Sequence, residues 1–273
     1  MTLGDAGLAQ AAALLRDADA LLVGAGAGMG VDSGLPDFRG DHGFWRAYPP
    51  LGARGVRFVE IANPASFDSD PALAWGFYGH RLALYRATVP HAGFAILRRI
   101  AARLAHGAFV YTSNVDGQFQ RAGFDDRHLI ECHGSIHHLQ CTLPCTDAIW
   151  SAGAVQPQVD PGTCRMAAPL PRCPHCGALA RPNILMFNDG RWLDTRTEAQ
   201  YGRYDDWRAR VRRPVVIELG AGTDVPSVRR MCEAQGAPLI RINPRAPQVA
   251  SSQGVGIAGS AVEVLEALQQ LLP

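Results

Sequence analysis

Four short apolar segments, each followed by a polar or glycine-bearing turn, most constrain how this chain of 273 residues can fold. These segments are residues 20–23, 108–112, 215–219 and 238–242. Helical patterns lie between or beside them, at residues 72–86, 91–105, 226–235 and 261–272. Short apolar runs that alternate with helices are typical of a doubly wound parallel sheet, so we predict an α/β fold. Ligands of such sheets bind at the carboxyl ends of the strands.

The first apolar segment runs into a glycine-rich stretch, GAGAGMGVDSGLPDFRG, at residues 24–40. A strand followed by a glycine turn is where α/β proteins hold phosphates. The stretch nevertheless contains no GxGxxG in any register, and no acidic residue stands about 20 positions further on, where residues 44–48 read FWRAY. A phosphate-loop lysine is also excluded, because every basic residue of the chain is arginine. The pattern therefore argues against a Rossmann dehydrogenase and a P-loop enzyme.

Composition limits the kinds of binding partner and the cellular compartment that we expect for this chain. The net charge of +1 gives no bulk attraction to nucleic acid or to an anionic membrane. Residues 1–20 have no basic leader, and their pattern is that of an amphipathic helix. No apolar run of the chain reaches the length of a membrane span. We expect a cytoplasmic protein that binds neither nucleic acid nor membrane. Its seven cysteines then point to a metal or to buried thiols.

Two stretches interrupt the alternation of strands and helices. Residues 41–87 are rich in aromatic residues and proline, and residues 136–187 hold five of the seven cysteines. Both are predicted to be insertions into the sheet domain, which would then comprise residues 1–40, 88–135 and 188–273.

The cysteines of the second insertion form two close pairs, CTLPC and CPHCG, separated by an irregular spacer. This spacing predicts one tetrahedral zinc site made of Cys141, Cys145, Cys173 and Cys176. Cys164 and His175 are alternative ligands, and scattered structural cysteines are the simpler alternative. Four thiolates close the coordination shell, so the zinc would be structural, and it would supply folding energy to a region with little apolar pattern.

Polar residues follow two further strand-like segments. Asn114 and Asp116 stand two apart in YTSNVDGQFQR, so both could face the ligand crevice, although an ordinary polar turn has the same pattern. His133 follows a short apolar run in HLIECHGSI, where the next two residues let the backbone turn away from it. A lone histidine is commonly structural, but this one would stand beside other ligand-type loops, which favours an imidazole in the cleft.

These motifs occur together in the order found in the sirtuin family. GAGMGVDSGLPDFRG, TSNVDGQFQRAG, ECHGSI, the cysteine pairs, GAG at 220–222 and INPR at 242–245 carry the resemblance, which covers about residues 21–272. The sequence resembles an NAD-dependent protein-lysine deacylase. The resemblance implies a Rossmann-like large domain (the three sheet segments above) and a small domain that joins a helical module at 41–87 to a zinc module at 136–187.

The resemblance also implies which residues meet NAD, the co-substrate. These residues are Gly26, Ala27, Gly28, Asp37, Phe38, Arg39, Ser113, Asn114, Asp116, Gly220, Gly222, Asn243 and Ser260. Phe38 would shield the reacting sugar carbon, Asn114 would orient the nicotinamide ribose, and Asp116 would bind the nicotinamide carboxamide. His133 would act as general base on a ribose hydroxyl, so the catalytic set is His133, Asn114 and Asp116. Nicotinamide and O-acyl-ADP-ribose would be released.

The partners implied are acyl-lysine proteins or peptides, and we expect a monomer. Tyr78 and Arg81, three apart in FYGHR, match the pair with which some sirtuins bind a succinyl or malonyl carboxylate. An ordinary helix with a core aromatic and a solvated arginine has the same spacing.

The chain departs from the family pattern at several positions. Gly30 replaces the usual serine, Ser113 replaces glutamine, and Asn188-Asp189 replaces Gly-Glu after Phe187. The changes bear on NAD affinity and on the peptide groove. An ADP-ribosyltransferase or an NAD glycohydrolase on the same fold is therefore the alternative function, and a non-catalytic nucleotide sensor is a further one.

Overall fold

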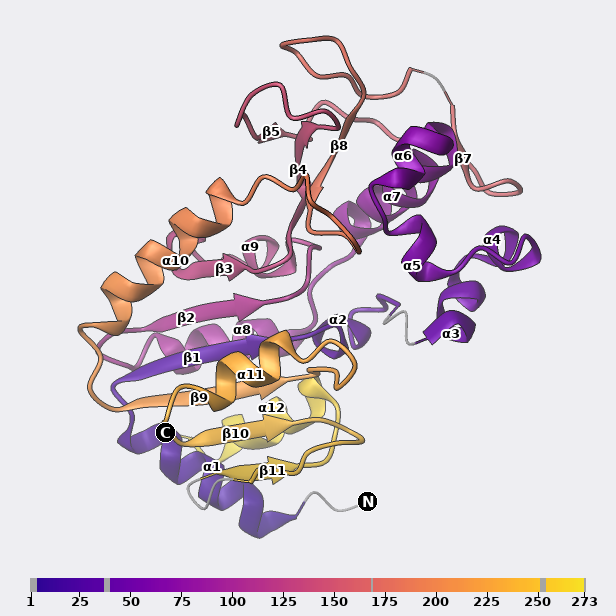
Figure 1. The fold of residues 1–273 in the computed structure, drawn as a ribbon. Helices are drawn as coiled ribbons and strands as arrows, with labels where there is room; N and C mark the ends of the chain where they lie inside the picture. The colour runs from indigo at the N-terminus through magenta and orange to yellow at the C-terminus, as the bar shows by residue number, and fades with distance from the viewer. Residues whose placement is uncertain (1–3, 37–39, 168, 251–253, 273) are drawn as a thin grey trace.

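The computed structural model describes residues 4–36, 40–167, 169–250 and 254–272, and its centre is a six-stranded parallel sheet (Figure 1). The order of the strands is β11-β10-β9-β1-β2-β3. Their bounds are β1 (Ala20–Ala25), β2 (Ala108–Thr112), β3 (Leu129–Glu131), β9 (Pro214–Leu219), β10 (Leu239–Ile242) and β11 (Val255–Ile257). The predicted α/β fold and its four strands are confirmed. Strand β1 pairs with both β2 and β9, so the strands that follow it are added first on one side of β1 and later on the other. Such folds bind ligands at this switch point.

Helices cover both faces of the sheet. Helices α1 (Asp5–Asp17), α8 (Ala92–Ala101) and α12 (Ala261–Gln270) pack on one face, and α10 (Thr195–Arg208) and α11 (Ser227–Glu233) pack on the other. Successive side chains of β1 alternate between the two cores, with Val23 in the first and Leu22 in the second. This double burial explains why the strands read as continuous apolar runs.

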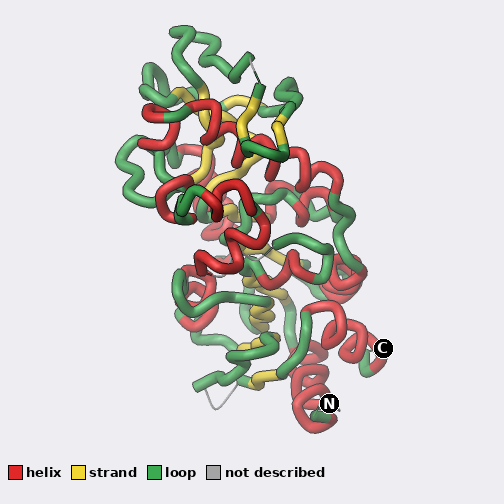
Figure 2. The backbone as a smooth tube through the Cα atoms, turned by 90° about the vertical axis from the view of Figure 1, so that its right-hand side faces the viewer, coloured by secondary structure: helices red, strands yellow, loops and turns green. Residues whose placement is uncertain are grey.

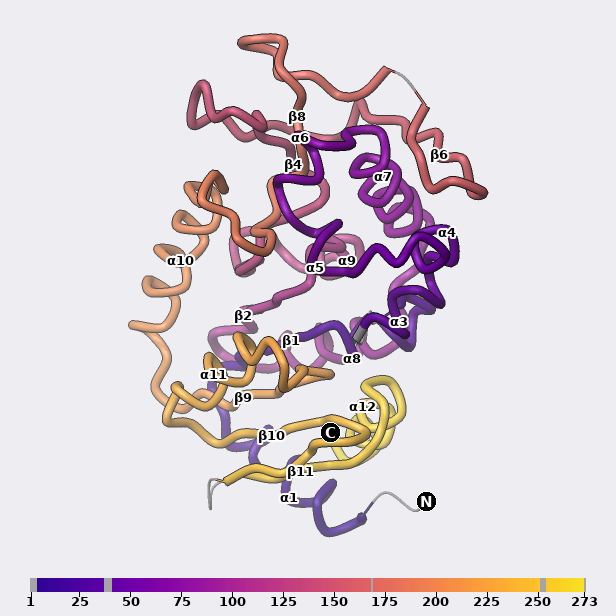
Figure 3. The backbone as a smooth tube through the Cα atoms, turned by 45° about the vertical axis from the view of Figure 1, so that its right-hand side comes forward, coloured from indigo at the N-terminus to yellow at the C-terminus, as the bar shows by residue number. Residues whose placement is uncertain are grey.

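The first insertion forms short helices gathered beside one long helix (Figure 3). They are α3 (Gly40–Ala47), α4 (Pro49–Ala53), α5 (Phe58–Ile61), α6 (Ala65–Ser69) and α7 (Pro71–Ala87). Helix α7 begins where the carboxylate of Asp70 accepts a hydrogen bond from the Leu73 amide, with Pro71 at the first helical position.

The second insertion contains no helix in its described part and is drawn as loops and strands in Figure 2. Strands β4 (Gly134–Cys141), β5 (Trp150–Ser151) and β8 (Ala180–Ile184) form an antiparallel sheet, and β6 (Val159–Asp160) pairs with β7 (Arg165–Met166). The two insertions share one core, in which Phe77 of α7 belongs to the same cluster as Ile136 of β4. A Cβ atom on Gly76 would lie 1.9 Å from the Cys164 carbonyl oxygen, so α7 and the second insertion make a close backbone contact.

The remaining elements lie in the loops that leave the sheet: α2 (Gly28–Val31), α9 (Gln118–Arg121) and the 3₁₀ helix η1 (Asp126–His128). The helix predicted at 91–105 is shorter and ends at Ala101, after which the amides of Arg103 and Leu104 bond to carbonyls three residues back instead of four. No helix in the described ranges is long and apolar enough to cross a membrane.

Candidate functional site

The glycine loop after β1 packs against the loop after β9. The Gly28 amide donates a hydrogen bond of 3.0 Å to the Gly220 carbonyl. A Cβ atom on Gly26 would lie 2.7 Å from the Ala221 Cα, and one on Gly28 would lie 2.6 Å from the Gly220 Cα. Gly220 itself has a φ of 57°. These glycines are therefore required by the crossing of two loops, a reason that the sequence alone does not give.

Asn114 joins the loop after β2 to the glycine loop. Its side-chain amide donates a hydrogen bond of 2.9 Å to the Gly26 carbonyl, and its own backbone amide donates to the Thr112 hydroxyl. The amide of Ser113 donates to the Ala25 carbonyl, which continues the pairing of β1 with β2. Residues predicted to meet the cofactor thus lie together at the carboxyl ends of β1, β2 and β9.

His133 reaches the same edge of the sheet from β3. The next residue, Gly134, has a φ of 76°, and a Cβ atom there would lie 2.1 Å from the Asn183 carbonyl oxygen. Burial lowers the pKa of His133 below its usual 6.5, and a hydrogen bond to the Ser113 backbone opposes that shift. The ring is consequently neutral at pH 7 and able to accept a proton. The Ser227 hydroxyl lies 3.4 Å from its Nε2 atom, a contact that the sequence does not signal.

Helix α10 holds β3, the strand that precedes His133. The Gln200 side-chain oxygen accepts from the Glu131 amide at 3.0 Å, and the Thr197 hydroxyl donates to the Glu131 carbonyl at 3.2 Å. Arg196 forms an ion pair with the Glu131 carboxylate, whose side chain is 1% exposed. One helix thus binds the amide, carbonyl and carboxylate of a residue two positions before His133.

The Asp116 side chain is buried and borders a cavity. Its carboxylate accepts a hydrogen bond of 2.9 Å from the Gln118 amide. The pKa of Asp116 is raised to about 6, because burial and, to a smaller extent, the nearby Glu131 raise it more than the Gln118 amide and Arg81 lower it. Asn114 and Asp116 therefore have different surroundings, although they stand two residues apart.

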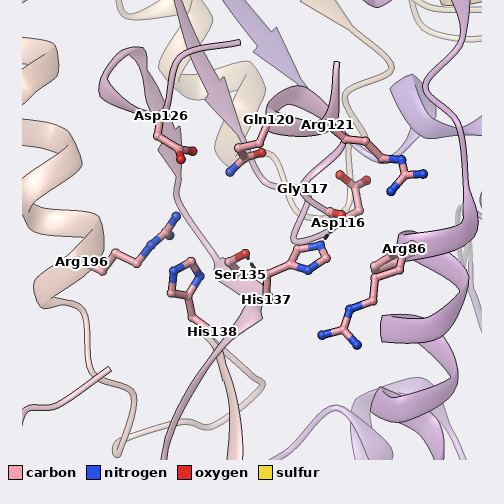
Figure 4. Close-up of a pocket in the computed structure, with 11 residues that line it drawn as sticks. Arg86, Asp116, Gly117, Gln120, Arg121, Asp126, Ser135, His137, His138 and Arg196 are labelled. Carbon is pink, nitrogen blue, oxygen red and sulfur yellow. Dashed lines mark hydrogen bonds between the residues drawn. The ribbon is translucent and has the colours of Figure 1, made fainter. Parts of the chain in front are cut away.

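A polar cavity of about 270 Å³ borders the Asp116 loop. The side chains of α7, α9, β4 and α10 line it, and Figure 4 shows His137 pointing toward Asp116 and His138 lying beside Arg196. The His137 ring bonds the Asp116 carbonyl oxygen at 2.9 Å. This bond ties β4 to the loop that follows β2 and contains Asp116.

Tyr78 and Arg81 are both buried on α7, which argues against a solvated arginine. The Arg81 guanidinium lies over the rings of Phe77, Tyr78 and Tyr85, at 5.2, 5.9 and 5.4 Å from their centroids. It donates two hydrogen bonds to the Tyr85 hydroxyl, at 2.9 and 2.7 Å. A cation buried among aromatic rings is a strong potential partner for a carboxylate.

The altered segment after Phe187 keeps a defined geometry. Asn188 has a φ of 55°, a conformation that asparagine adopts more readily than most residues. Asp189 forms a two-pronged ion pair with Arg181, with distances of 2.6 and 2.9 Å and side chains at most 1% exposed. The loop is thus tied to β8 despite its departure from the family pattern.

Of the remaining predicted cofactor residues, the structure describes Asn243 and Ser260. The Asn243 side chain donates to the Ala221 carbonyl at 3.0 Å, so it supports the loop that contains Gly220 and Gly222. Ser260 caps α12 by accepting from the Glu263 amide. Asp37, Phe38 and Arg39 lie outside the described residues.

Four cysteines of the second insertion lie close enough together to hold a metal ion. The sulfur atoms of Cys141, Cys145, Cys173 and Cys176 all lie within 4.8 Å of one another. The Cys141–Cys176 and Cys145–Cys173 sulfur distances are 3.7 and 3.6 Å. A tetrahedron of sulfurs about 2.3 Å from zinc has edges of about 3.8 Å, so the cluster fits one structural zinc ion. Cys164 and His175 are not members of this cluster.

Comparisons with known proteins agree with this arrangement. The model of the Sir2 family matches residues 26–205. The chain is 30% identical to the NAD-dependent protein deacylase 1 of Pseudomonas aeruginosa, over 95% of this chain and 97% of the relative. It is 32% identical to the NAD-dependent protein deacylase 2 of Pyrobaculum aerophilum, over 93% and 92%. A solved complex of a Sir2 homologue with NAD is similar in structure, with a TM-score of 0.71, 25% identity and coverage of 96% and 92%.

Proposed function

The chain belongs to the Sir2 family, and from that premise we propose which of its residues carry out NAD-dependent protein deacylation. The observation that carries the assignment is the meeting of three loops at one sheet edge. Asn114 is bonded to the Gly26 carbonyl there, and the neutral ring of His133 lies beside Ser113. NAD and zinc are the cofactors of this enzyme, as NAD-bound relatives and the four-cysteine cluster support.

We assign the NAD pocket to the crossing loops after β1 and β9. Gly26, Ala27 and Gly28 would bind the phosphates and ribose, with Ser113 beside them, and Gly220, Gly222, Asn243 and Ser260 would surround the adenosine half. The crossing of Gly28 over Gly220 supports this assignment, because it presents backbone rather than side chains to the ligand. Asp37, Phe38 and Arg39 are proposed to cover the reacting sugar.

His133 is proposed as the general base. The acyl oxygen of the substrate lysine captures the ribose carbon as nicotinamide leaves, and His133 removes the proton from a ribose hydroxyl that attacks the resulting carbon centre. Water then releases the free lysine and O-acyl-ADP-ribose. Asn114 would hold the ribose and Asp116 the carboxamide. A neutral imidazole is required for the proton removal, and the lowered pKa of His133 supports that state at pH 7.

Dicarboxylic acyl-lysines, such as succinyl-lysine, are the proposed preferred substrates. The support is the position of Arg81, which is buried on α7, donates to the Tyr85 hydroxyl and lies over the Tyr78 ring. A guanidinium in this position presents the planar set of N–H donors that recognises the carboxylate of a dicarboxylic acyl group.

We further propose that Cys141, Cys145, Cys173 and Cys176 hold the zinc, and that the ion stabilises the second insertion without taking part in the reaction. The small domain would consist of residues 41–87 and 136–187, which share one core. We propose that the protein is a monomer in the cytoplasm, that acyl-lysine proteins are its partners, and that it does not bind nucleic acid. Seven unpaired cysteines support a reducing compartment.

One incubation tests the proposed reaction. The purified protein is mixed with NAD and either an acetyl-lysine or a succinyl-lysine peptide, and nicotinamide and O-acyl-ADP-ribose are measured. We expect both products only when peptide is present. Nicotinamide release without peptide would favour the NAD glycohydrolase, and transfer of ADP-ribose to protein would favour the transferase.

A further inference from the structure

We propose that His91 is a positioning residue that fixes the cofactor loop, defined here as residues 26–33, and that it does so only with an uncharged ring. The proposal rests on the proposed function, since it assigns a role at the segment given to NAD. His91 is half-buried, lies between α7 and α8, and belongs to none of the motifs that carry the family resemblance.

Three hydrogen bonds connect His91 to its surroundings. The ring Nε2 atom bonds the Met29 carbonyl oxygen at 2.9 Å, and the backbone amide donates to the Ser33 hydroxyl at 3.0 Å. The ring Nδ1 atom accepts from the Gly93 amide at 3.0 Å, which caps α8. A single residue thus contacts the cofactor loop at two points and begins a helix of the sheet domain.

These partners determine which ring nitrogen carries the proton. The Gly93 amide can only donate, so Nδ1 must offer a lone pair, and the Met29 carbonyl can only accept, so Nε2 must carry the hydrogen. A second proton on Nδ1 would face the Gly93 amide and the positive end of the helix. Protonation therefore breaks the cap, and the bond to Met29 is weakened when the ring moves.

Among the described residues, the cofactor loop has other anchors too, including a bond from the Gly26 amide to the Leu219 carbonyl. Asn114 holds the Gly26 carbonyl, Gly220 accepts from the Gly28 amide, and the Asp32 carboxylate accepts from the Val262 amide at 2.9 Å. None of them engages the carbonyl of Met29, a residue that is fully buried. Without His91 this buried carbonyl loses its described side-chain partner, and the loop is held less firmly in the position that binds NAD.

The charges around the ring are known from the described elements. Burial lowers the pKa of His91 below its usual 6.5, whereas the Met29 carbonyl, Asp32 on the cofactor loop and Glu266 on α12 oppose the shift. The folded state therefore favours the neutral ring. The contribution of His91 to loop order is complete above pH 6.5 and is lost as the pH falls below that value.

Two substitutions separate the two bonds of the ring. Asparagine is a good helix cap but is too short to reach Met29, so His91→Asn keeps the cap and loses the loop contact. We expect His91→Asn to raise the Kd and the KM for NAD about tenfold, with kcat and the melting temperature near those of the wild type. His91→Ala should also lower the melting temperature. Arg99→Ala is the matched control, because Arg99 lies on the same helix and donates to Gln269 instead.

Calorimetric titration with NAD from pH 5.5 to 8 makes the test independent of turnover. The wild type should lose affinity below pH 6.5 more steeply than His91→Asn does. Nitrogen-15 spectra of the histidine rings should place the His91 proton on Nε2. Equal NAD affinity for wild type and His91→Asn, or a proton on Nδ1, would overturn the role of His91. Tight NAD binding without deacylation of any peptide would instead count against the proposed function alone.

Discussion

The hydroxyl of Ser227 lies 3.4 Å from Nε2 of His133, although 94 residues separate the two in sequence. Ser227 is the first residue of α11, which follows the loop that contains Gly220 and Gly222. The proposed general base is therefore in contact with the helix that follows the loop assigned to adenosine. A hydroxyl that donates to Nε2 keeps a lone pair on that atom and favours the neutral ring.

Ser227→Ala should lower kcat about threefold to tenfold with little change in the KM for NAD, because one hydrogen bond to the base is lost. In the wild type, kcat/KM should fall as the pH drops below 6.5, because His133 must be neutral to accept a proton. In Ser227→Ala the fall in kcat/KM should begin at a higher pH. Steady-state rates across pH 5.5–8 check both statements, and an unchanged profile in the variant would show that the contact is incidental.

Asp116→Asn should stabilise the fold at pH 7 while reducing turnover. The pKa of Asp116 is raised from 3.8 to about 6 in the folded state. Between these two values the folded state binds more protons than the unfolded state, so stability falls as the pH rises through this range. The neutral amide removes that cost, which is about 1–3 kcal/mol at pH 7 and absent below pH 3.8.

Urea denaturation at pH 7 and pH 3.5 measures this difference. Asp126→Asn is the control, because Asp126 lines the same cavity but is exposed. If Asp116→Asn is no more stable than the wild type at pH 7, the claim that a buried Asp116 carboxylate destabilises the fold would be contradicted.

Cys173→Ser should abolish stoichiometric zinc and unfold the second insertion, since a missing thiolate opens the tetrahedral shell. Metal analysis should give one zinc per wild-type chain and much less for this variant. Cys164→Ser is the matched control, because Cys164 is buried in the same insertion but lies outside the cluster. Loss of zinc from Cys164→Ser, or its retention in Cys173→Ser, would show that the ligand set is different.

Arg81→Met should reduce desuccinylation by a factor of about 100 and deacetylation by a much smaller factor, because only the succinyl group has a carboxylate to bind. The comparison uses kcat/KM for two peptides that differ in the acyl group. Arg86→Met is the control, since Arg86 lies on α7 too but donates to the carbonyls of Val155 and Ala152. Equal losses for both peptides in Arg81→Met would identify Arg81 as a structural residue.

Some of these features could be predicted from the sequence because their signals are local. Strands such as β2 are buried on both faces and leave a continuous apolar run, and the cysteine pairs carry their own spacing. Strand β11 is only three residues long and contains glycine, so it offers no periodic signal. The short helices before α7 are likewise held by a shared core rather than by a pattern of their own.

The supporting contacts of the site could not be predicted, because their partners are distant in sequence. Glu131 is held by α10, more than 60 residues further along the chain. Gly26 and Gly28 are glycines because Gly220 and Ala221 cross over them, which is a packing constraint and not a local one. The family resemblance supplied the roles of the site residues, and the structure supplies the contacts that would support those roles.

The stoichiometry of a single-turnover reaction tests the central claim most directly. Wild-type protein, NAD and an acyl-lysine peptide should yield nicotinamide, free lysine and O-acyl-ADP-ribose in equal amounts. His133→Ala should still bind NAD but form O-acyl-ADP-ribose at least 100 times more slowly, because the ribose hydroxyl has lost its base. Wild-type protein that releases nicotinamide without forming the ester, or His133→Ala with full ester formation, would contradict the account.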